Sequence, residues 1–280
     1  MNISRRRCLI LIAAGVTTPR NLAAELLRGV PRLGVLAPGV VAQVPYWNGL
    51  WDGLRDLGCV DGRTIKSDVK ESAGSLVSLP ALARELVALR PDAIVAGSPP
   101  AVDAAKTATR TSPVIMLGVS SPLELGFIKG FPRPGGNVTG VTLLAQGLGA
   151  KRLQLLREVL PELSRVAVLW NPSNRGAVIT FQETQRGAHS LGMTVISAPV
   201  TKADDVPRSL AATLSERPGA LNVISGPVTV GQRERAAIVE FAVKHRLCSI
   251  SRFPAEAADG GRRQSQRSTS APQLQSSTRS

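Results

Sequence analysis

The sequence predicts an α/β protein of two lobes, each a doubly wound parallel sheet. Short apolar runs alternate with amphipathic segments of helical period along most of the chain, and this alternation occurs twice. The two series are separated by the sequence FPRPGGNVTGV at residues 131–141. Its prolines exclude helix and its Gly-Gly pair permits a sharp turn, so we expect the chain to pass between lobes here. The alternative is an ordinary surface loop within one domain.

The first half of the chain carries four runs with the length and composition of strands, at residues 32–37, 64–71, 93–96 and 114–117. The run at 64–71 alternates weakly and suits an edge strand. Apolar residues at helical spacing predict helices between these runs, at residues 45–57, 79–89 and 101–109. Trp47 and Trp51 lie on the apolar stripe of the first helix, which should face the sheet. This rhythm implies right-handed crossovers and a parallel sheet.

The second half repeats the pattern. Strands are predicted at residues 166–170, 194–198, 220–224 and 248–250. Helices are predicted at residues 150–160, 176–191, 204–216 and 230–245. An extended segment at 138–144 should join the two halves. No Gly-x-Gly-x-x-Gly follows the first strand of either half and no P-loop is present, which argues against a dinucleotide-binding enzyme.

The N-terminus has the pattern of an export signal. Arg5, Arg6 and Arg7 precede an apolar run at residues 8–16, and a stretch of small and polar residues ends near Ala24. The apolar run is far shorter than the roughly 20 residues that a membrane-spanning helix needs. The arginines resemble a twin-arginine signal, although Cys8 replaces the usual aromatic residue, so both the Sec and the Tat route stay open. We predict a periplasmic location; a basic helix that stays attached is the alternative.

The strong positive charge does not indicate a nucleic-acid partner. The formal net charge is +14, but the charges of the body are scattered. Aromatic residues are few, with three Trp, one Tyr and five Phe, and no helix-turn-helix or zinc-finger spacing occurs. We therefore expect no nucleic acid among the partners.

Several motifs together resemble a known family. The sequence RPGGNVTG at residues 133–140, followed after a helix by SRVAVLWNP at 164–172, resembles the ABC-transporter substrate-binding protein family. GLWDGLRDLG at 49–58 and PDAIVAG at 91–97 add to the resemblance, which runs from about Arg32 to Gly261. It implies a type I periplasmic-binding fold of two Rossmann-like lobes.

The resemblance also implies a function. Such a receptor closes two lobes on a small solute and delivers it to the ABC permease subunits of an importer. The family is often associated with aromatic or branched amino acids, so an amino acid or another small carboxylate is the implied ligand. We expect a monomer without enzymatic activity, cofactor or metal.

The candidate ligand site lies beyond the carboxyl ends of the strands, where loops and helix N-termini gather. Hydroxyls and exposed amides at such positions can hold a carboxylate. No Arg or Asp stands out in these loops, so we expect amides and hydroxyls to dominate recognition. The predicted ligand-binding residues are Tyr46, Ser98, Pro99, Ser120 and Ser121 in the first half, and Asn171, Ser173, Asn174, Ser225 and Gly226 in the second.

Each candidate also has a purely structural interpretation. Ser98 and Ser120 can be simple helix N-caps, and residues 171–174 can form a strand-to-helix turn held by Asx hydrogen bonds. Tyr46 can belong to the core stripe beside Trp47. Trp170 ends a buried strand and is expected in the core.

Cysteines and histidines supply little material for a metal site or a hydrolytic triad. Cys59 and Cys248 fall in different predicted lobes, and we favour two free thiols, although a disulfide stays open. His189 and His245 both fall near predicted helix ends, where surface positions explain them.

The C-terminal residues depart from the family pattern. We divide the chain into an export signal (1–30), lobe 1 (31–141), lobe 2 (142–252) and a tail (253–280). The tail is rich in Arg, Ser, Gln and Thr and is predicted to be disordered. Relatives would continue here with elements that return to the first lobe, so a frameshift or truncation would leave that lobe incomplete.

Three other functions compete with the receptor. A truncated paralogue would bind nothing. A two-lobed α/β enzyme, such as a racemase or transferase, would need paired Cys, His or carboxylate groups in facing loops, which these loops lack. A cytoplasmic sensor would need a DNA-binding headpiece, for which residues 1–30 are too short and apolar.

Overall fold

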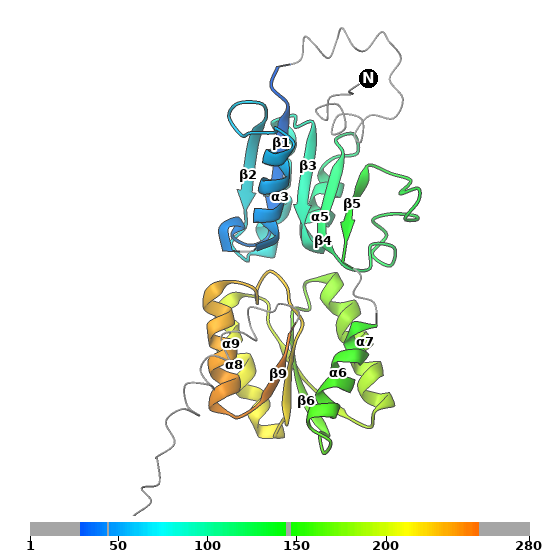
Figure 1. Ribbon diagram of the computed structural model, residues 1–280, viewed down its shortest axis with the longest axis vertical. Coiled ribbons are helices and arrows are strands. Elements are labelled where there is room, and N and C mark those ends of the chain that lie inside the picture. Colours follow the sequence, from blue (N-terminus) through cyan, green and yellow to red (C-terminus); the bar gives the residue numbers. More distant parts are fainter. Residues whose placement is uncertain (1–28, 44, 144–146, 252–280) are drawn as a thin grey trace, which may run out of the picture.

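The computed structural model describes residues 29–43, 45–143 and 147–251, with only the backbone described for Gln43, Pro45 and Tyr46. These residues form two α/β lobes stacked along the long axis (Figure 1). Nearly all of the predicted export signal and the whole predicted tail lie outside the described residues, so both stay predictions. The incompleteness of the first lobe, which depends on the tail, also stays a prediction.

Lobe 1 is a parallel sheet of five strands in the order β2-β1-β3-β4-β5. The strands are β1 (Arg32–Ala37), β2 (Lys66–Glu71), β3 (Ala93–Gly97), β4 (Val114–Val119) and β5 (Val138–Thr142). The α-helices are α3 (Pro45–Asp56), α4 (Leu79–Ala88) and α5 (Ser98–Ala108), and short 3-10 turns lie at Val41–Gln43 and Leu76–Ser78. The strands of this sheet point their carboxyl ends toward lobe 2 (Figure 1).

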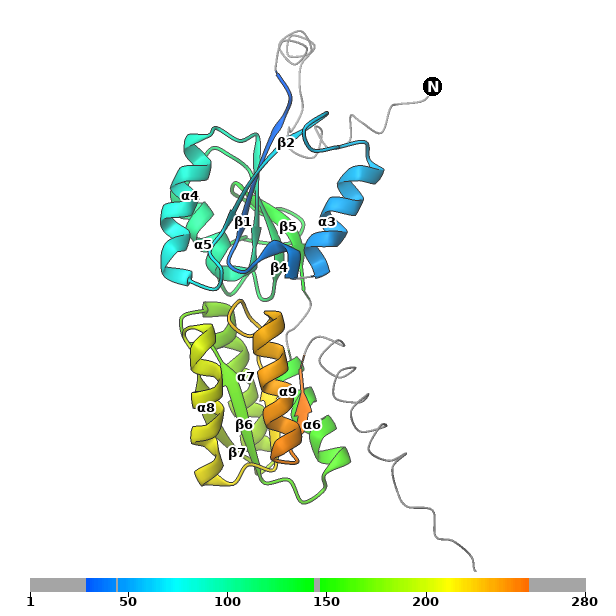
Figure 2. The ribbon, with the colours of Figure 1, turned by 90° about the vertical axis from the view of Figure 1, so that its left-hand side faces the viewer.

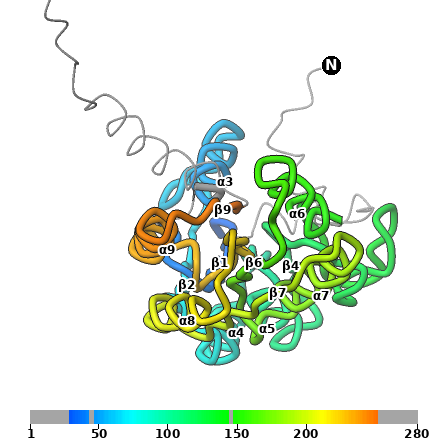
Figure 3. The backbone as a smooth tube through the Cα atoms, turned by 90° about the horizontal axis from the view of Figure 1, so that it is seen from below, coloured from blue at the N-terminus to red at the C-terminus, as the bar shows by residue number. Residues whose placement is uncertain are grey.

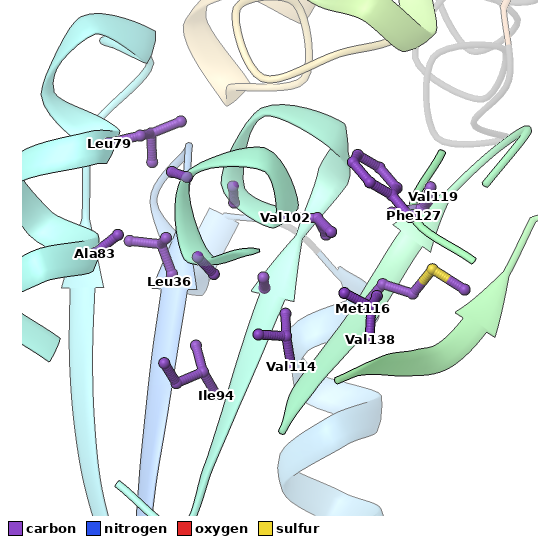
Figure 4. Close-up of a cluster of buried hydrophobic side chains, with 14 of the residues drawn as sticks. Leu36, Leu79, Ala83, Ile94, Val102, Val114, Met116, Val119, Phe127 and Val138 are labelled. Carbon is purple, nitrogen blue, oxygen red and sulfur yellow. The ribbon is translucent and has the colours of Figure 1, made fainter. Parts of the chain in front are cut away.

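The two faces of this sheet are covered unequally. Among the described residues, helices α4 and α5 lie on one face and α3 is the one helix on the other (Figure 2). Leu36, Ile94 and Val114 project from three strands into the core under α4 and α5 (Figure 4). The cluster under α3 has four buried members, Val35, Ala37, Trp47 and Val95. Most of the buried apolar surface of lobe 1 is thus on the α4/α5 side.

Lobe 2 is a parallel sheet of four strands in the order β7-β6-β8-β9. The strands are β6 (Arg165–Trp170), β7 (Thr194–Pro199), β8 (Ala220–Val223) and β9 (Cys248–Ile250). The α-helices are α6 (Leu148–Val159), α7 (Arg175–Ser190), α8 (Val206–Ala212) and α9 (Gln232–Lys244), with 3-10 turns at Ala203–Asp205 and Thr213–Glu216. Figure 3 shows α8 and α9 on one side of this sheet and α6 and α7 on the other.

Each face of the second sheet has its own apolar core. Leu153 of α6, Phe181 of α7 and Val168 of β6 belong to one cluster, and Leu210 of α8 and Ile238 of α9 belong to the other. Trp170, predicted to be in the core, packs against the first of these cores but is only partly buried. Its ring stacks on Phe181 with the centroids 4.0 Å apart, and its Nε1 donates to Ser197 Oγ at 2.9 Å.

Most predicted elements appear close to their predicted bounds, with three differences. Helix α5 begins at Ser98 and not at residue 101, because Pro99 and Pro100 fit the first turn of a helix, where no N–H is needed. The extended segment predicted to lead from one lobe to the other also pairs with β4, as the edge strand β5, before the chain enters lobe 2. The helix predicted at 204–216 is the short α8 with a 3-10 turn at each end.

The histidines and cysteines lie near their predicted places. His189 is in the last turn of α7 and His245 is the C-cap of α9. Cys59, in lobe 1, and Cys248, in lobe 2, are both free and partly exposed. Among the described helices, none combines the length and the hydropathy that a membrane span requires.

The lobes contact each other through α5, α7 and the loops after β4 and β8. Arg175 Nη1 lies 3.0 Å from Asp103 Oδ1, and Arg175 Nη2 donates to the Leu125 carbonyl at 3.3 Å. Ile179 of α7 packs against the α4/α5 core of lobe 1, and Val230 of lobe 2 packs against the α3 cluster. The two lobes are therefore in direct contact.

Candidate ligand-binding site

A cavity of about 340 Å³ lies between the two lobes, at the carboxyl ends of both sheets. Both lobes contribute to its wall. The apolar lining comes from Trp47, Leu117, Val141, Leu143, Leu148, Ala177, Ile224, Val230 and four prolines or glycines of the loops after β1 and β8 (Pro38, Gly39, Gly226, Pro227). The side chains with hydrogen-bonding groups that line it are Ser98, Ser120, Arg152, Asn174, Thr180 and Ser225.

Ser98 occupies an unusual position in the first turn of α5. Its φ is +72°, a left-handed value that costs a non-glycine residue energy. Its hydroxyl is buried and has no hydrogen-bond partner, and Gly97, not Ser98, is the N-cap. The N-cap interpretation of Ser98 is therefore wrong. Backbone strain and an unsatisfied hydroxyl at a cavity wall are features typical of ligand-binding positions.

Trp47 explains why the residue before Ser98 is glycine. A Cβ on Gly97 would lie 2.5 Å from the Trp47 ring, so only glycine lets the indole reach this depth. Trp47 itself is 1% exposed and lines the cavity. The packing of one aromatic ring on the end of β3 thus shapes the lobe 1 wall.

Residues 171–174 form the turn that starts α7. Asn171 Oδ1 accepts from the Ser173 N–H at 2.8 Å, and Asn174 Oδ1 accepts from the Gly176 N–H at 3.0 Å as a helix N-cap. The structural interpretation of this turn, with Asx hydrogen bonds, is confirmed. Asn174 also lines the cavity, whereas Asn171 and Ser173 lie outside the lining.

The start of α7 touches the start of α5. A Cβ on Gly176 would lie 2.8 Å from Pro99 Cγ, across the boundary between the lobes. Any larger residue at this position meets the proline ring before the lobes reach their present separation. The two helix N-termini therefore meet at the cavity because residue 176 is glycine.

Ser225 is the lobe 2 counterpart of Ser98. It follows β8 in a turn that Thr229 closes, since the Thr229 hydroxyl accepts from the Gly226 N–H at 2.9 Å. The Ser225 hydroxyl is buried without a hydrogen-bond partner. Each lobe thus presents one buried, unpaired serine hydroxyl in a residue that lines the same cavity.

The two serines after β4 have different positions. Ser120 lines the cavity, but no helix follows it, so the N-cap interpretation of Ser120 is wrong. Ser121 is buried at 6% exposure, has a φ of +55° and lies outside the lining. Of these two predicted residues, Ser120 therefore lines the cavity and Ser121 does not.

Six of the ten predicted ligand-binding residues line the cavity: Ser98, Pro99, Ser120, Asn174, Ser225 and Gly226. Ser121, Asn171 and Ser173 do not. The side chain of Tyr46 lies outside the described residues. A ligand role for any of them stays a prediction.

Arg152 and Thr180 also line the cavity but were not predicted as ligand-binding residues. All predicted residues were taken from loops and helix starts, whereas these two lie inside α6 and α7. No local pattern marked Arg152. It lies on the same side of α6 as Leu148, Leu155 and Val159, which are all at least 38% exposed, so its position in the sequence is that of an ordinary surface cation.

Two carboxylates near the contact between the lobes have raised pKa values. Burial raises the pKa of Asp103, against the opposing charge of Arg175. Burial also raises the pKa of Glu183, and the nearby charge of Glu124 in lobe 1 adds to the effect, whereas a hydrogen bond from the Gly147 N–H opposes it. Neither Asp103 nor Glu183 lines the cavity.

A second cavity of about 290 Å³ lies between α3 and β2 in lobe 1. Its lining comes from lobe 1 alone and includes Trp51, Arg55 and Cys59. It lies away from the contact between the lobes. Among the described residues, no group of three or more His, Cys, Asp or Glu side chains is arranged to hold a metal ion.

Comparison with known proteins agrees with this architecture. A family model described as ABC transporter substrate binding protein matches residues 39–251. The "Tyrosine-binding protein" of Clostridioides difficile (strain R20291) is 24% identical over 213 residues, which cover 76% of this chain. The chain spans 59% of the length of that relative.

Two solved structures share the fold. A conserved domain protein from Vibrio cholerae gives a TM-score of 0.74 at 22% identity, over 82% of this chain and 76% of that chain. The ABC domain from Streptococcus pneumonia in complex with L-Trp gives a TM-score of 0.72 at 20% identity, over 87% of this chain and 86% of that chain.

Two parallel-sheet α/β lobes that enclose a cavity at their strand ends define a binding protein of the type I periplasmic fold, and the predicted fold class is confirmed. The chain belongs to the ABC transporter substrate-binding protein family, whose model covers most of its length. Members of this family bind substrates for transporters, are not enzymes, and generally work in the periplasm or outside the cell.

Proposed function

We propose that the chain is the solute-binding component of an ABC importer and holds an amino acid or another small carboxylate between its lobes. The observation that carries this proposal is the pair of buried hydroxyls without partners, Ser98 and Ser225, one on each wall of the cavity. The tyrosine-binding name of the Clostridioides relative and the L-Trp in the Streptococcus structure support a ligand of this class.

The two hydroxyls suggest how the ligand stabilises the closed form. A buried polar group without a partner costs about 1–3 kcal/mol. A ligand that bonds to Ser98 in lobe 1 and Ser225 in lobe 2 removes both costs only when the lobes are closed. Differential affinity of this kind shifts the lobes toward closure.

The rest of the wall suits the other end of such a ligand. Trp47, Leu117, Leu148 and Ile224 offer apolar surface around the polar groups. Micromolar affinity requires about 8 kcal/mol, and burial of one apolar side chain together with charge-assisted hydrogen bonds reaches that range. Hinge closure then presents a compact form to the permease subunits.

The location and the partners follow from the same proposal. The predicted export signal would place the mature chain in the periplasm, where its partner would be the membrane permease of the importer. One copy of the chain encloses the cavity by itself, which supports a monomer.

A thermal-melting screen of the purified chain against amino acids and small carboxylates tests the proposal, followed by calorimetry with each compound that raises the melting temperature. Binding to the native state alone raises its stability. We expect Ser98→Ala and Ser225→Ala each to weaken binding at least tenfold. Ser190→Ala, which removes an exposed hydroxyl at the far end of α7, is the matched control and should bind normally.

Absence of any response across the screen, in a chain that melts cooperatively, would contradict the proposal and favour a paralogue that no longer binds solutes. Tight binding that Ser98→Ala and Ser225→Ala both leave unchanged would place the ligand elsewhere on the protein.

A further inference from the structure

Asn171, directly after β6, has a buried donor group without a partner. The residue is 2% exposed, and its Nδ2 makes no hydrogen bond within the part of the chain that the structure describes. We propose that this donor and the Ser225 hydroxyl together bind the carboxylate of the ligand, which places the carboxylate end of the ligand against lobe 2. This orientation rests on the proposed function and adds to it.

The turn that starts α7 fixes the orientation of the Asn171 amide. Asn171 Oδ1 accepts from the Ser173 N–H at 2.8 Å, and a backbone N–H can bond only to the oxygen of the amide. The Nδ2 group is therefore not used by the turn. A serine or a threonine can close a similar turn with its hydroxyl oxygen. The turn thus explains the side-chain oxygen at position 171 but leaves the nitrogen without a role.

Asn171 and Ser225 follow neighbouring positions of adjacent strands. Leu169 of β6 pairs with Val223 of β8, and the Ile224 N–H donates to the Leu169 carbonyl at 2.9 Å. Asn171 and Ser225 each come two residues after this pair, so the alternation of side chains along the strands directs both to the same side. Adjacent strands lie about 4.8 Å apart, a separation at which one small group can reach both side chains.

The same two strand ends border the cavity between the lobes. A Cβ on Gly226 would lie 3.4 Å from Asn174 Nδ2, so the loops after β6 and β8 are in contact. Asn174, Ser225 and Gly226 line the cavity, whereas Asn171 lies behind them, outside the lining. A ligand group that bonds to the Ser225 hydroxyl therefore comes close to Asn171 Nδ2.

Two neighbouring donors require an acceptor. The Ser225 hydroxyl and Asn171 Nδ2 are both buried and have no partner among the described residues, so they do not bond to each other. A carboxylate has two oxygens with about four lone-pair sites and can accept from both groups at the same time. Hydrogen bonds to an ionised acceptor are about twice as strong as those between neutral groups. The carboxylate of the ligand thus satisfies both donors.

Two serine variants test the role of Asn171 by calorimetry on the purified chain, with L-tyrosine, L-phenylalanine and L-leucine as probes. Asn171→Ser keeps an oxygen for the Ser173 N–H and removes the amide nitrogen. It should weaken binding at least tenfold and leave the melting temperature of the free protein nearly unchanged. Asn137→Ser is the matched control, because Asn137 Nδ2 donates to the Thr109 and Ser112 carbonyls at the amino end of the lobe 1 sheet. It should lower the melting temperature and leave binding within twofold.

Amino alcohols test which end of the ligand Asn171 contacts. L-tyrosinol, L-phenylalaninol and L-leucinol keep the apolar body and the ammonium group of the three probes and replace the carboxylate by a hydroxymethyl group. Each alcohol should bind the parent chain at least tenfold more weakly than its amino acid, and Asn171→Ser should weaken the alcohol less than the amino acid. If none of the three amino acids binds, the acid with the highest affinity in the wider screen and its matched alcohol take their place.

The outcomes separate the orientation from the proposed function. Binding that a folded Asn171→Ser variant leaves within twofold overturns the role of Asn171, whose Nδ2 then holds an ordered water only, and leaves the proposed function intact. An alcohol that Asn171→Ser weakens as much as its amino acid also overturns it, because the lost contact is then not to the carboxylate. If Asn171→Ser fails to fold, Asn171→Thr replaces it in the same comparison. Absence of binding by every compound of the wider screen refutes both the orientation and the proposed function.

Discussion

The two lobes share one construction but differ in how their sheets are covered. In lobe 2, helix pairs cover both faces, and each face has a buried core of its own. In the part of lobe 1 that the structure describes, α4 and α5 cover one face and α3 alone covers the other. The α3 cluster also receives Val230 from lobe 2. Part of the burial in lobe 1 therefore depends on closure, and the cavity wall there is coupled to the position of lobe 2.

Trp47 and Trp170 illustrate the same difference in how the two sheets are covered. Trp47 is 1% exposed, sits in the thin α3 layer and lines the cavity. Trp170 is partly exposed and stacks on Phe181 against a core that two helices cover. Removal of either ring tests how far each lobe relies on one side chain.

Trp47→Ala should have the largest effect on stability. Replacement of a buried aromatic ring by alanine costs about 3–5 kcal/mol, and Trp47 is almost completely buried in the cluster under α3. Trp170→Ala should cost less, about 1–3 kcal/mol, because part of its ring is already in water. Urea denaturation of both variants measures the two costs. Equal costs would contradict the difference in coverage.

Gly176→Ala should impair closure without loss of stability. The added methyl group meets Pro99 Cγ at 2.8 Å, so the lobes cannot reach their present separation unless one of them shifts. We expect ligand affinity to fall at least tenfold, about 1.4 kcal/mol. Calorimetry measures the affinity. Thermal melting of the free protein measures its stability.

Gly49→Ala is the matched control, because a Cβ there meets nothing within 4 Å on the exposed side of α3. It should raise stability by about 0.5–1 kcal/mol and leave affinity unchanged. Normal binding by Gly176→Ala would show that the lobes close differently around a ligand.

Ser98→Gly should separate strain from recognition within lobe 1. Glycine adopts the φ of +72° without cost, so the free protein should gain about 1 kcal/mol in stability. Loss of the hydroxyl should weaken ligand binding at the same time. Ser98→Ala keeps the strain and removes only the hydroxyl, so it should weaken binding to a similar degree without the gain in stability. A destabilised glycine variant would show that the strain is relieved elsewhere.

Asp103→Asn should have the smallest effect. Because burial raises the pKa of Asp103, its ionised form is less favourable in the folded state than in the unfolded state, and this cost disappears as the pH falls through the raised pKa. The partly exposed ion pair with Arg175 offsets the cost by at most about 1 kcal/mol. We expect the stability at pH 7 to change by no more than about 0.5 kcal/mol.

Melting curves from pH 7 to pH 4 test the sign of this effect. The stability of the parent chain relative to the Asp103→Asn variant should rise as the pH falls. A parent chain that loses stability relative to the asparagine variant over that range would contradict the raised pKa.

The sequence alone predicted the strand and helix pattern well, because apolar periodicity is local and each lobe repeats it. The start of α5 was misplaced, since Pro99 and Pro100 suggest a loop unless the first turn of a helix is considered. The strand β5 was taken for a linker because its pairing with β4 depends on distant residues.

The polar loop residues of the cavity were also predictable, since strand ends in parallel sheets gather at one edge. Arg152 and the contact of Pro99 with Gly176 were not. The first depends on which face of α6 meets the cavity, and the second on how far the lobes close. Neither property is encoded in a local pattern of residues.

The central claim, that a small solute binds between the lobes, is tested most directly by tryptophan fluorescence. The chain has three tryptophans, of which Trp47 lines the cavity between the lobes and Trp51 lines the second cavity of lobe 1. Two double variants, with phenylalanine at the other two positions, leave Trp47 or Trp51 as the sole fluorophore. A titration with a compound that calorimetry shows to bind both double variants should change the emission of the Trp47 protein, saturably and at the calorimetric affinity, and leave the Trp51 protein unchanged. A response of the Trp51 protein alone would place the ligand outside the cleft and contradict the account.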